Sequence, residues 1–214
     1  MVVAVTADMI GSRQLEDRAR AQRTLDDAIA RVEDDLPLAD RALKPTVGDE
    51  QQGVYPTLEA ALGSLLLLRL ALPDAVGVRF GLGIGAVGVI PSEAAAAGIS
   101  DGPGWWAARA AIDHVHKLEQ RQVPGVRTWV VAHDSEPAAA QDAVRWANAY
   151  LLARDQLVSD MSERTRRLTY GRCLGRTQRR LAASEEITQS AVSQALASSG
   201  AAAIVEGFVQ LGLR

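Results

Sequence analysis

The order of strand and helix patterns in the first part of the chain restricts the fold more than any other feature. Four short apolar or alternating runs predict β-strands, at residues 2–6, 41–46, 51–55 and 76–84. Two longer runs with apolar residues at helical spacing predict helices, at residues 14–36 and 57–72. The order strand–helix–strand–strand–helix–strand is that of the split βαβ sheet of ferredoxin-like folds. We therefore predict an α/β (α+β) domain built on such a sheet.

Further segments extend this domain and lead out of it. A stretch rich in glycine and proline predicts a loop at 90–104, followed by a helix at 105–120 and a last strand at 127–132. A helix is expected at 137–159. We divide the chain into an α/β domain at 1–135, a connecting helix at 136–160 and an all-α domain at 161–214. Because a helix joins the two parts, we expect them to be mechanically coupled.

Two short helices around a tight turn are predicted at 178–197. Thr177 and Thr188 stand where a side-chain oxygen can cap each helix. The second helix has one apolar face and one polar face. The apolar face carries Ala191, Val192, Ala195 and Leu196, and the polar face carries Gln189, Ser190, Ser193 and Gln194. Amides and hydroxyls on an exposed helix can pair with base edges in the DNA major groove.

This segment resembles the helix-turn-helix of phage repressor and Cro proteins. Ala182 stands where the helices of that motif cross closely, and Ile187 is the apolar residue of the turn. Glu186 occupies a position where that family usually has a glycine with positive φ, so we expect either strain or an altered turn there. The resemblance implies double-stranded DNA as a partner. The expected DNA contacts are Arg179, Arg180, Thr188, Gln189, Ser190, Ser193 and Gln194. An ordinary amphipathic helical hairpin is the alternative.

Charge is distributed unevenly along the chain. Residues 162–214 hold eight arginines and four glutamates, whereas residues 1–161 hold 15 lysines and arginines against 22 acidic residues. The basic segment therefore coincides with the predicted DNA-binding helices, as attraction to phosphates requires. Arg164, Arg166 and Arg167 are further candidates for phosphate contacts, or form a solvated basic face.

Composition narrows the class of protein. A hydrophobic content of 48% is ordinary for a globular protein, and no apolar run is long enough to span a bilayer. The N-terminus has no basic region or cleavage site of a signal peptide. The lone Cys173 excludes an intrachain disulfide, and the three histidines form no zinc-ligand pattern with it. We therefore expect a cytoplasmic protein with no membrane partner.

Carboxylates end one strand and occupy the turn of the predicted hairpin. Asp8 follows the first strand, while Asp49 and Glu50 lie in the turn after Gly48. The first strand and the hairpin are neighbours in a split βαβ sheet, so these side chains are expected to converge. Paired carboxylates suit Mg²⁺, which shares oxygen ligands with phosphates. The alternative is structural, with Asp8 as a helix cap and Asp49 in a Gly-Asp turn.

Four sequence blocks carry a second resemblance. They are ADMIGS at 7–12, GDE at 48–50, RFGLGIGAV at 79–87 and DGPGWWAARAAI at 101–112. In this order they resemble the SatD family, with a cyclase-like domain and a C-terminal helix-turn-helix, and they are similar to class III nucleotidyl cyclases. The resemblance implies that Asp8 and Asp49 hold metal, that Arg109 stabilises phosphate, and that Gly48 and Glu50 border the ligand. It also implies a homodimer, with these carboxylates facing the partner's arginine.

One position departs from the cyclase pattern. Trp105 stands where cyclases have an asparagine, and an indole cannot replace that amide. The expectation is a transcriptional regulator that senses a nucleotide with Mg²⁺, without catalysis. The alternatives are a nucleotidyl cyclase or transferase with a DNA-binding tail, and a DNA-binding protein whose α/β domain only dimerises.

Gly81, Gly83 and Gly85 are expected to bend a strand or to admit phosphates. Trp105 and Trp106 stack on a base or fill the core.

Overall fold

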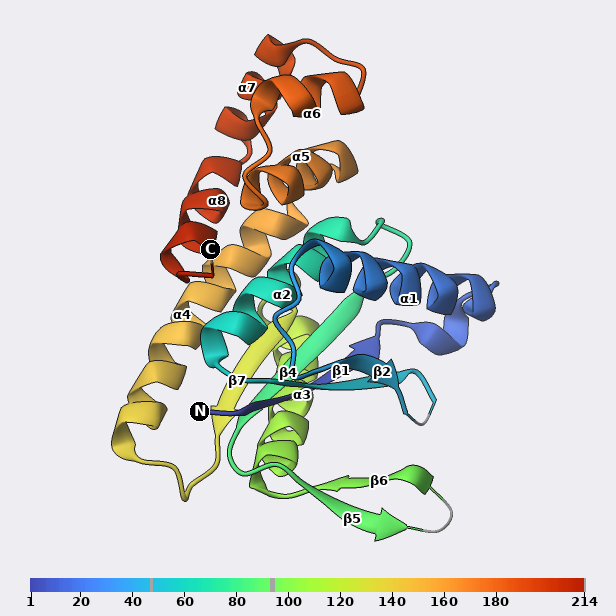
Figure 1. Cartoon of the computed structure of the whole chain (residues 1–214), viewed down its shortest axis with the longest axis vertical. Helices are drawn as coiled ribbons and strands as arrows, with labels where there is room; N and C mark the ends of the chain where they lie inside the picture. Colours follow the sequence, from blue (N-terminus) through green and yellow to red (C-terminus); the bar gives the residue numbers. More distant parts are fainter. Residues whose placement is uncertain (47, 93–94, 214) are drawn as a thin grey trace.

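A five-stranded sheet forms the centre of the computed structural model, which describes residues 1–46, 48–92 and 95–213 (Figure 1). Its strands are β1 (Val3–Met9), β2 (Arg41–Pro45), β3 (Glu50–Tyr55), β4 (Val78–Ile84) and β7 (Thr128–Ala132). They are ordered β2-β3-β1-β4-β7, with antiparallel pairing throughout the first four and β7 parallel to β4. The predicted split βαβ sheet is confirmed, and β7 extends it by one parallel strand.

Helices cover both faces of this sheet. Successive side chains of β1 point to opposite faces, and the apolar ones on each face pack against helices. Val3, Val5 and Ala7 belong to the large core beneath α1 (Arg18–Asp35) and α2 (Leu58–Ala71). Ala4 packs instead with Trp105 of α3 (Pro103–Arg121) on the other face. The predicted first helix is shorter than expected, since a 3₁₀ turn at Ser12–Gln14 precedes α1. In Figure 1, α1 and α2 lie above the sheet.

The glycines of β4 have a role that the sequence did not reveal. A Cβ on Gly81 would lie 2.3 Å from the carbonyl oxygen of Ala108, and one on Gly83 would lie 1.9 Å from that of Gly104. Helix α3 therefore rests with its backbone directly on β4. The expectation that these glycines bend the strand or admit phosphates is replaced by this close packing.

The predicted loop at 90–104 is wrong. The chain there forms a two-stranded antiparallel arm, β5 (Gly88–Ser92) and β6 (Ala95–Asp101), which projects from the body (Figure 1). Residues 93 and 94 of that predicted loop lie outside the described part. Val89, Ile90 and Ile99 on the arm are about half exposed. An arm that buries little of its own surface need not show the alternation by which buried strands are recognised.

Helix α4 (Ala138–Ser159) runs along the edge strand β7 and covers its free backbone. Asn148 accepts a hydrogen bond from the Val130 N–H and donates one to the Val130 carbonyl, both at 2.9 Å. The predicted helix at 137–159 is confirmed. By satisfying the edge of the sheet, α4 becomes part of the body.

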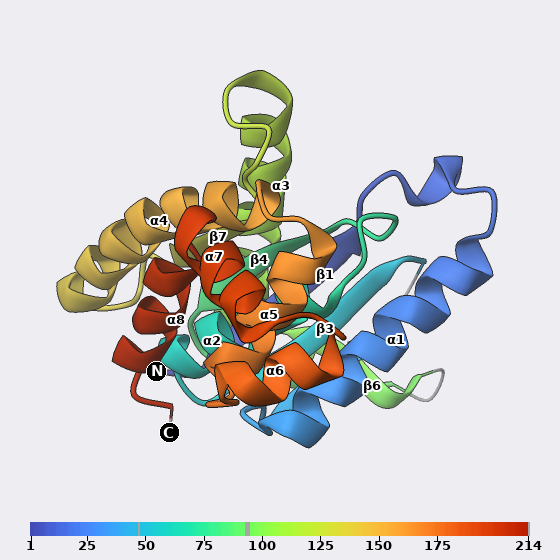
Figure 2. The ribbon, with the colours of Figure 1, turned by 90° about the horizontal axis from the view of Figure 1, so that it is seen from above.

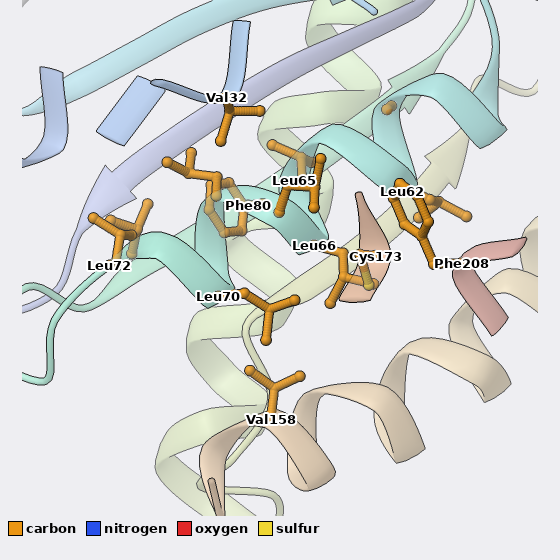
Figure 3. Close-up of a cluster of buried hydrophobic side chains, with 14 of the residues drawn as sticks. Val32, Leu62, Leu65, Leu66, Leu70, Leu72, Phe80, Val158, Cys173 and Phe208 are labelled. Atoms are coloured by element: carbon orange, nitrogen blue, oxygen red, sulfur yellow. The ribbon is translucent and has the colours of Figure 1, made fainter. Parts of the chain in front are cut away.

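The last helices in the described part of the chain are α5 (Glu163–Cys173), α6 (Gln178–Ser184), α7 (Gln189–Ser198) and α8 (Ala201–Gln210). Figure 2, a view from above, shows them over α2 and α4. The core is continuous across this junction. Figure 3 shows Leu66 and Leu62 of α2 beside Cys173 of α5 and Phe208 of α8. Among the described residues, no single helix is long and apolar enough to cross a membrane. Only α7 and α8 taken together have that length and composition, and they are bent by 79° relative to each other.

The turn between α6 and α7 agrees with the sequence in detail. Thr177 accepts a hydrogen bond from the Arg180 N–H at 3.2 Å, and Thr188 accepts one from Ala191 at 3.1 Å, so both predicted caps are confirmed. Glu186 has φ = 54°, the conformation that favours glycine. Of the two expectations for Glu186, the positive φ is the one that the structure shows, rather than an altered turn.

Candidate functional site

The strand register brings the predicted carboxylates to one edge of the sheet. Asp8 lies opposite Glu50 of β3 on one side and Arg79 of β4 on the other. It is the penultimate residue of β1 rather than the residue after the strand. Asp49 precedes Glu50 in the β2–β3 turn, where Gly48 has φ = 77°.

Arg79 binds Asp8 and was not among the predicted site residues. Its Nη1 lies 3.0 Å from Oδ2 of Asp8, and its Nε donates to Glu119 of α3 at 2.6 Å. The second oxygen of Asp8, Oδ1, is buried and makes no hydrogen bond within the described residues. Burial raises the pKa of Asp8, Arg79 opposes the rise, and the neighbouring charge of Asp49 adds to it. Asp8 thus has one desolvated oxygen that no hydrogen bond from the described residues satisfies.

Asp49 and Glu50 are each paired with an arginine of a different helix. Asp49 lies 3.8 Å from Arg18 at the start of α1, and about a third of its side chain is exposed. Glu50 forms an ion pair with Arg109 of α3. The structure therefore joins Arg109 to the carboxylate cluster within one chain, through Glu50 rather than through Asp8 or Asp49.

A hollow of about 350 Å³ lies beside this cluster, between β1, β3, the arm and α3. It is lined by Thr6, Gln52, Ser100, Trp105, Trp106 and Arg109. Gln52 also donates to Glu50 at 2.9 Å, so the hollow adjoins the carboxylates. Indole surface, a guanidinium and neutral polar groups are the side chains that a base and a phosphate require.

The two tryptophans differ in burial. Trp105 is 5% exposed, and its buried Nε1–H has no partner among the described residues. Trp106 is 56% exposed and donates to Asp101 at 3.1 Å. Trp105 therefore fills the core on the α3 face, and Trp106 offers an open ring face.

Metal binding would depend on few protein ligands. The described residues contain no group of three or more His, Cys, Asp or Glu side chains that could hold a metal. Asp8 and Asp49 would supply two carboxylates, the ligand type that a hard cation takes, and Oδ1 of Asp8 has no hydrogen-bond partner among the described residues. Phosphate and water oxygens would have to complete the shell.

The polar face predicted on α7 is open to solvent. Gln189, Ser190, Ser193 and Gln194 are all exposed, as are Arg179 and Arg180 on α6. Thr188 is also exposed, and its hydroxyl lies 2.9 Å from that of Ser190. Val192 and Leu196 are buried on the opposite face.

Two of the further arginines considered as phosphate contacts have other partners. Arg166 is buried and pairs with Asp74. Arg167 forms two hydrogen bonds with Glu185, at 2.8 and 2.7 Å. Arg164 is exposed.

Sequence reasoning missed Arg79, Glu119 and Gln52. The available signal for Arg79 was its charge near the start of the otherwise apolar run of β4. Glu119 and Gln52 have no such signal, because their roles come from register and from the approach of α3.

A family model described as the SatD family matches residues 2–205. No curated protein sequence matches the chain significantly. Among solved structures, adenylate cyclases from Trypanosoma brucei match with 15% identity and a TM-score of 0.42, over 53% of this chain and 68% of theirs. The guanylate cyclase domain of RhGC from Catenaria anguillulae, solved with GTP, matches with 15% identity and a TM-score of 0.41, over 52% and 71%. The adenylyl cyclase CyaB from P. aeruginosa matches with 10% identity and a TM-score of 0.39, over 56% and 81%.

Proposed function

The chain belongs to the SatD family, and from that premise we propose that it is a sequence-specific DNA-binding transcriptional regulator. In this proposal its N-terminal domain, residues 1–135, binds a nucleotide or related phosphate ligand together with Mg²⁺. The connecting helix at 136–160 transmits the ligand state to a DNA-binding domain at 161–214. The observation that carries the proposal is the exposed polar face of α7, set on a buried apolar face.

The geometry of α6 and α7 supports DNA binding. Short helices capped by Thr177 and Thr188 and joined by a four-residue turn have the form of a helix-turn-helix. If α7 is the recognition helix, the side chains of its first turn, which include Gln189 and Ser190, would be the ones to meet base edges. Arg179 and Arg180 are exposed on the preceding helix, where they can meet phosphates.

A binding experiment on DNA tests this part. A target site is selected from random duplexes, and affinity is measured by fluorescence anisotropy at several salt concentrations. The change Gln189→Ala with Gln194→Ala is expected to cost about 1–3 kcal/mol per lost base contact at the selected site. The change Arg179→Gln with Arg180→Gln is expected to weaken binding to every sequence and to flatten the salt dependence. Gln210→Ala, an exposed glutamine on α8, is the matched control. Unchanged affinity of the double glutamine variant would exclude α7 as the reading helix.

The ligand part of the proposal is supported by the hollow and by the free oxygen of Asp8. Mg²⁺ with GTP or ATP is expected to raise the melting temperature, because a ligand bound only by the folded protein stabilises it. Asp49→Asn is expected to abolish the rise that depends on Mg²⁺. Asp142→Asn, an exposed aspartate on α4, is the control. No shift with either nucleotide would favour a domain that serves dimerisation alone.

The enzyme alternative requires a separate assay. A nucleotidyl cyclase would convert ATP or GTP to a cyclic product, and Trp105 replaces the asparagine that the cyclase resemblance requires. Trp105 is nearly fully buried and its Nε1–H points to no acceptor among the described residues. We expect no cyclic product by chromatography with Mg²⁺ or Mn²⁺, and its appearance would overturn the sensor proposal in favour of an enzyme.

A homodimer is part of the proposal, since paired half-sites suit a two-fold protein. A shared ligand site would require Arg109 to leave Glu50 of its own chain and reach the partner's carboxylates. Mixing Asp49→Asn chains with Arg109→Ala chains tests this, because only a heterodimer would contain one intact site. No recovery of the ligand response in the mixture would reject a shared site.

A further inference from the structure

A second hollow lies where the sheet body meets the C-terminal helices. Its volume is about 180 Å³, and arginines from three separate segments border it. Arg69 comes from α2, Arg127 from the turn before β7, and Arg166 from α5, with Ser159 at the end of α4. Apolar residues of the α2–β4 connection complete the wall. This hollow is distinct from the carboxylate cluster and from the residues that line the first one.

The guanidinium groups around this hollow are crowded and poorly solvated. Asp155 is fully buried and is shared by two arginines, lying 3.1 Å from Arg69 and 2.8 Å from Arg154. Burial lowers the pKa of Arg69 to about 10; Asp155 opposes this effect, while Arg154, Arg127 and Arg166 add to it. Positive charges therefore repel one another at a place where water screens them weakly.

Arg166 has a donor without an acceptor. The residue is 7% exposed; its Nη1 donates to the Met161 carbonyl at 3.1 Å, and its Nη2 donates to Asp74 at 2.5 Å. Its Nε is buried and has no hydrogen-bond partner within the described residues. A buried unpaired N–H of a charged group is costly, and Arg166 borders the hollow, so an acceptor that reached this N–H would be stabilised.

The acidic group at the rim of the hollow is itself exposed to solvent. The carboxylate of Asp74 is 72% exposed, so it can rotate away from Arg166 into water. Glu163 accepts a hydrogen bond from the backbone N–H of Asp74 at 2.7 Å rather than pairing with Arg166. Nη1 of Arg127 lies 3.0 Å from Glu119 and donates to the carbonyls of Pro124 and Val126, and the Arg127 side chain is partly exposed. Asp74 is therefore the one carboxylate that an incoming anion would displace from Arg166.

We propose that this hollow binds a small oxyanion of the phosphate class through Arg69, Arg127 and Arg166. Ser159 borders the hollow, but its hydroxyl accepts a hydrogen bond from Arg69 at 3.0 Å and donates to the Gly125 carbonyl at 3.2 Å. Guanidinium groups bind such oxyanions through parallel charge-assisted hydrogen bonds. The volume is far above the roughly 10–15 Å³ that one water requires, so a phosphate group has room. Because Arg166 belongs to α5 and the other two arginines to the body, the anion would link the C-terminal helices to the sheet.

The bound anion would also be connected to the first site by ion pairs. Arg127 shares Glu119 with Arg79, and Arg79 in turn binds Asp8. An anion that draws Arg127 into the hollow would loosen its contact with Glu119. Any effect on ligand binding near Asp8 would be reciprocal. The oxyanion site itself does not depend on the proposed DNA or nucleotide binding.

Isothermal titration of the full chain with inorganic phosphate, against sodium chloride of equal ionic strength, tests the proposal. Wild-type protein is expected to bind phosphate saturably, with a matching rise in melting temperature. Arg166→Gln and Arg127→Gln are each expected to weaken binding about tenfold or more, as the loss of a charged hydrogen bond implies. Arg164→Gln, an exposed arginine on the same helix, is the matched control and is expected to bind as wild type.

Two further comparisons complete the test. The phosphate response is expected to persist in Asp49→Asn, which separates this site from the proposed nucleotide site. Titration of the Asp49→Asn variant with adenosine monophosphate, beside inorganic phosphate, shows whether the site takes a free ion or the phosphoryl group of a larger molecule. Whichever of the two binds more tightly identifies the source. If Arg166→Gln does not fold, Arg127→Gln decides alone. The proposal is wrong if phosphate has no effect beyond chloride, or if both folded variants bind it as wild type does.

Discussion

Replacing Glu186 by glycine is expected to stabilise the protein, although the change removes a whole side chain. Glu186 has φ = 54° and is exposed. An L-residue in the left-handed region carries a strain of roughly 1–2 kcal/mol. Glycine adopts this conformation without strain.

The net effect is smaller than the strain released. Glycine makes the unfolded chain more flexible, which opposes folding by about 0.4–1 kcal/mol. The expected gain in the free energy of unfolding is therefore about 1 kcal/mol. For a chain of this size that corresponds to a rise in melting temperature of about 2–4 °C.

Calorimetry and urea unfolding of Glu186→Gly beside Glu186→Ala measure this gain. The alanine variant loses the same charge but keeps the Cβ, so it is expected to melt at or below the wild-type temperature. If the glycine variant is no more stable than the alanine variant, the strain assigned to this turn is absent and the reasoning fails.

Two further predictions concern packing and ionisation. Gly83→Ala places a Cβ 1.9 Å from the Gly104 carbonyl oxygen, and is expected to cost at least about 1–3 kcal/mol in urea unfolding as α3 is pushed from the sheet. Gly207→Ala on α8, which meets Tyr150 at an ordinary 3.5 Å, is the control, and an equal loss in both would contradict the close-packing argument. Burial raises the pKa of Tyr55 from 10.0 to about 12, so above pH 10 the unfolded chain releases a proton that the folded chain retains. Stability is then expected to fall as pH rises from 10 to 12, by about 1.4 kcal/mol per unit for this group, and Tyr55→Phe should reduce that slope; an unchanged slope would show that Tyr55 ionises equally in both states.

Much of the fold could be predicted because the signals are local. Strand and helix patterns identified the five strands of the main sheet and the helices α1 to α4, α6 and α7, whereas α5 and α8 were not predicted. Thr177 and Thr188 marked two helix starts through contacts only three residues away. The arm of β5 and β6 was missed because its strands pair with each other outside the core. Burial, which produces the readable pattern elsewhere, acts on them weakly.

The candidate site could be predicted only in outline. The topology placed β1 beside the hairpin, so the proximity of Asp8 to Glu50 followed from the order of elements. The partner of Asp8, Arg79, lies 71 residues away, and that of Glu50, Arg109, lies 59 residues away. Such pairs depend on strand register and on how closely α3 approaches the sheet, and neither leaves a local trace.

The sequence by itself determined the kind and order of the elements of the main sheet and of the helices that cover it, both predicted caps and the unusual backbone position of Glu186, because short-range sterics, hydrogen bonding and local burial patterns set these features. Only the tertiary structure decided what Gly81 and Gly83 do and where Arg166 lies. Gly81 and Gly83 allow the backbones of α3 and β4 to touch, and Arg166 is carried into the junction by the continuous core of α2, α5 and α8. Both outcomes arise from packing between segments distant in the chain, where the burial of apolar surface fixes the positions of charged groups that no local pattern records.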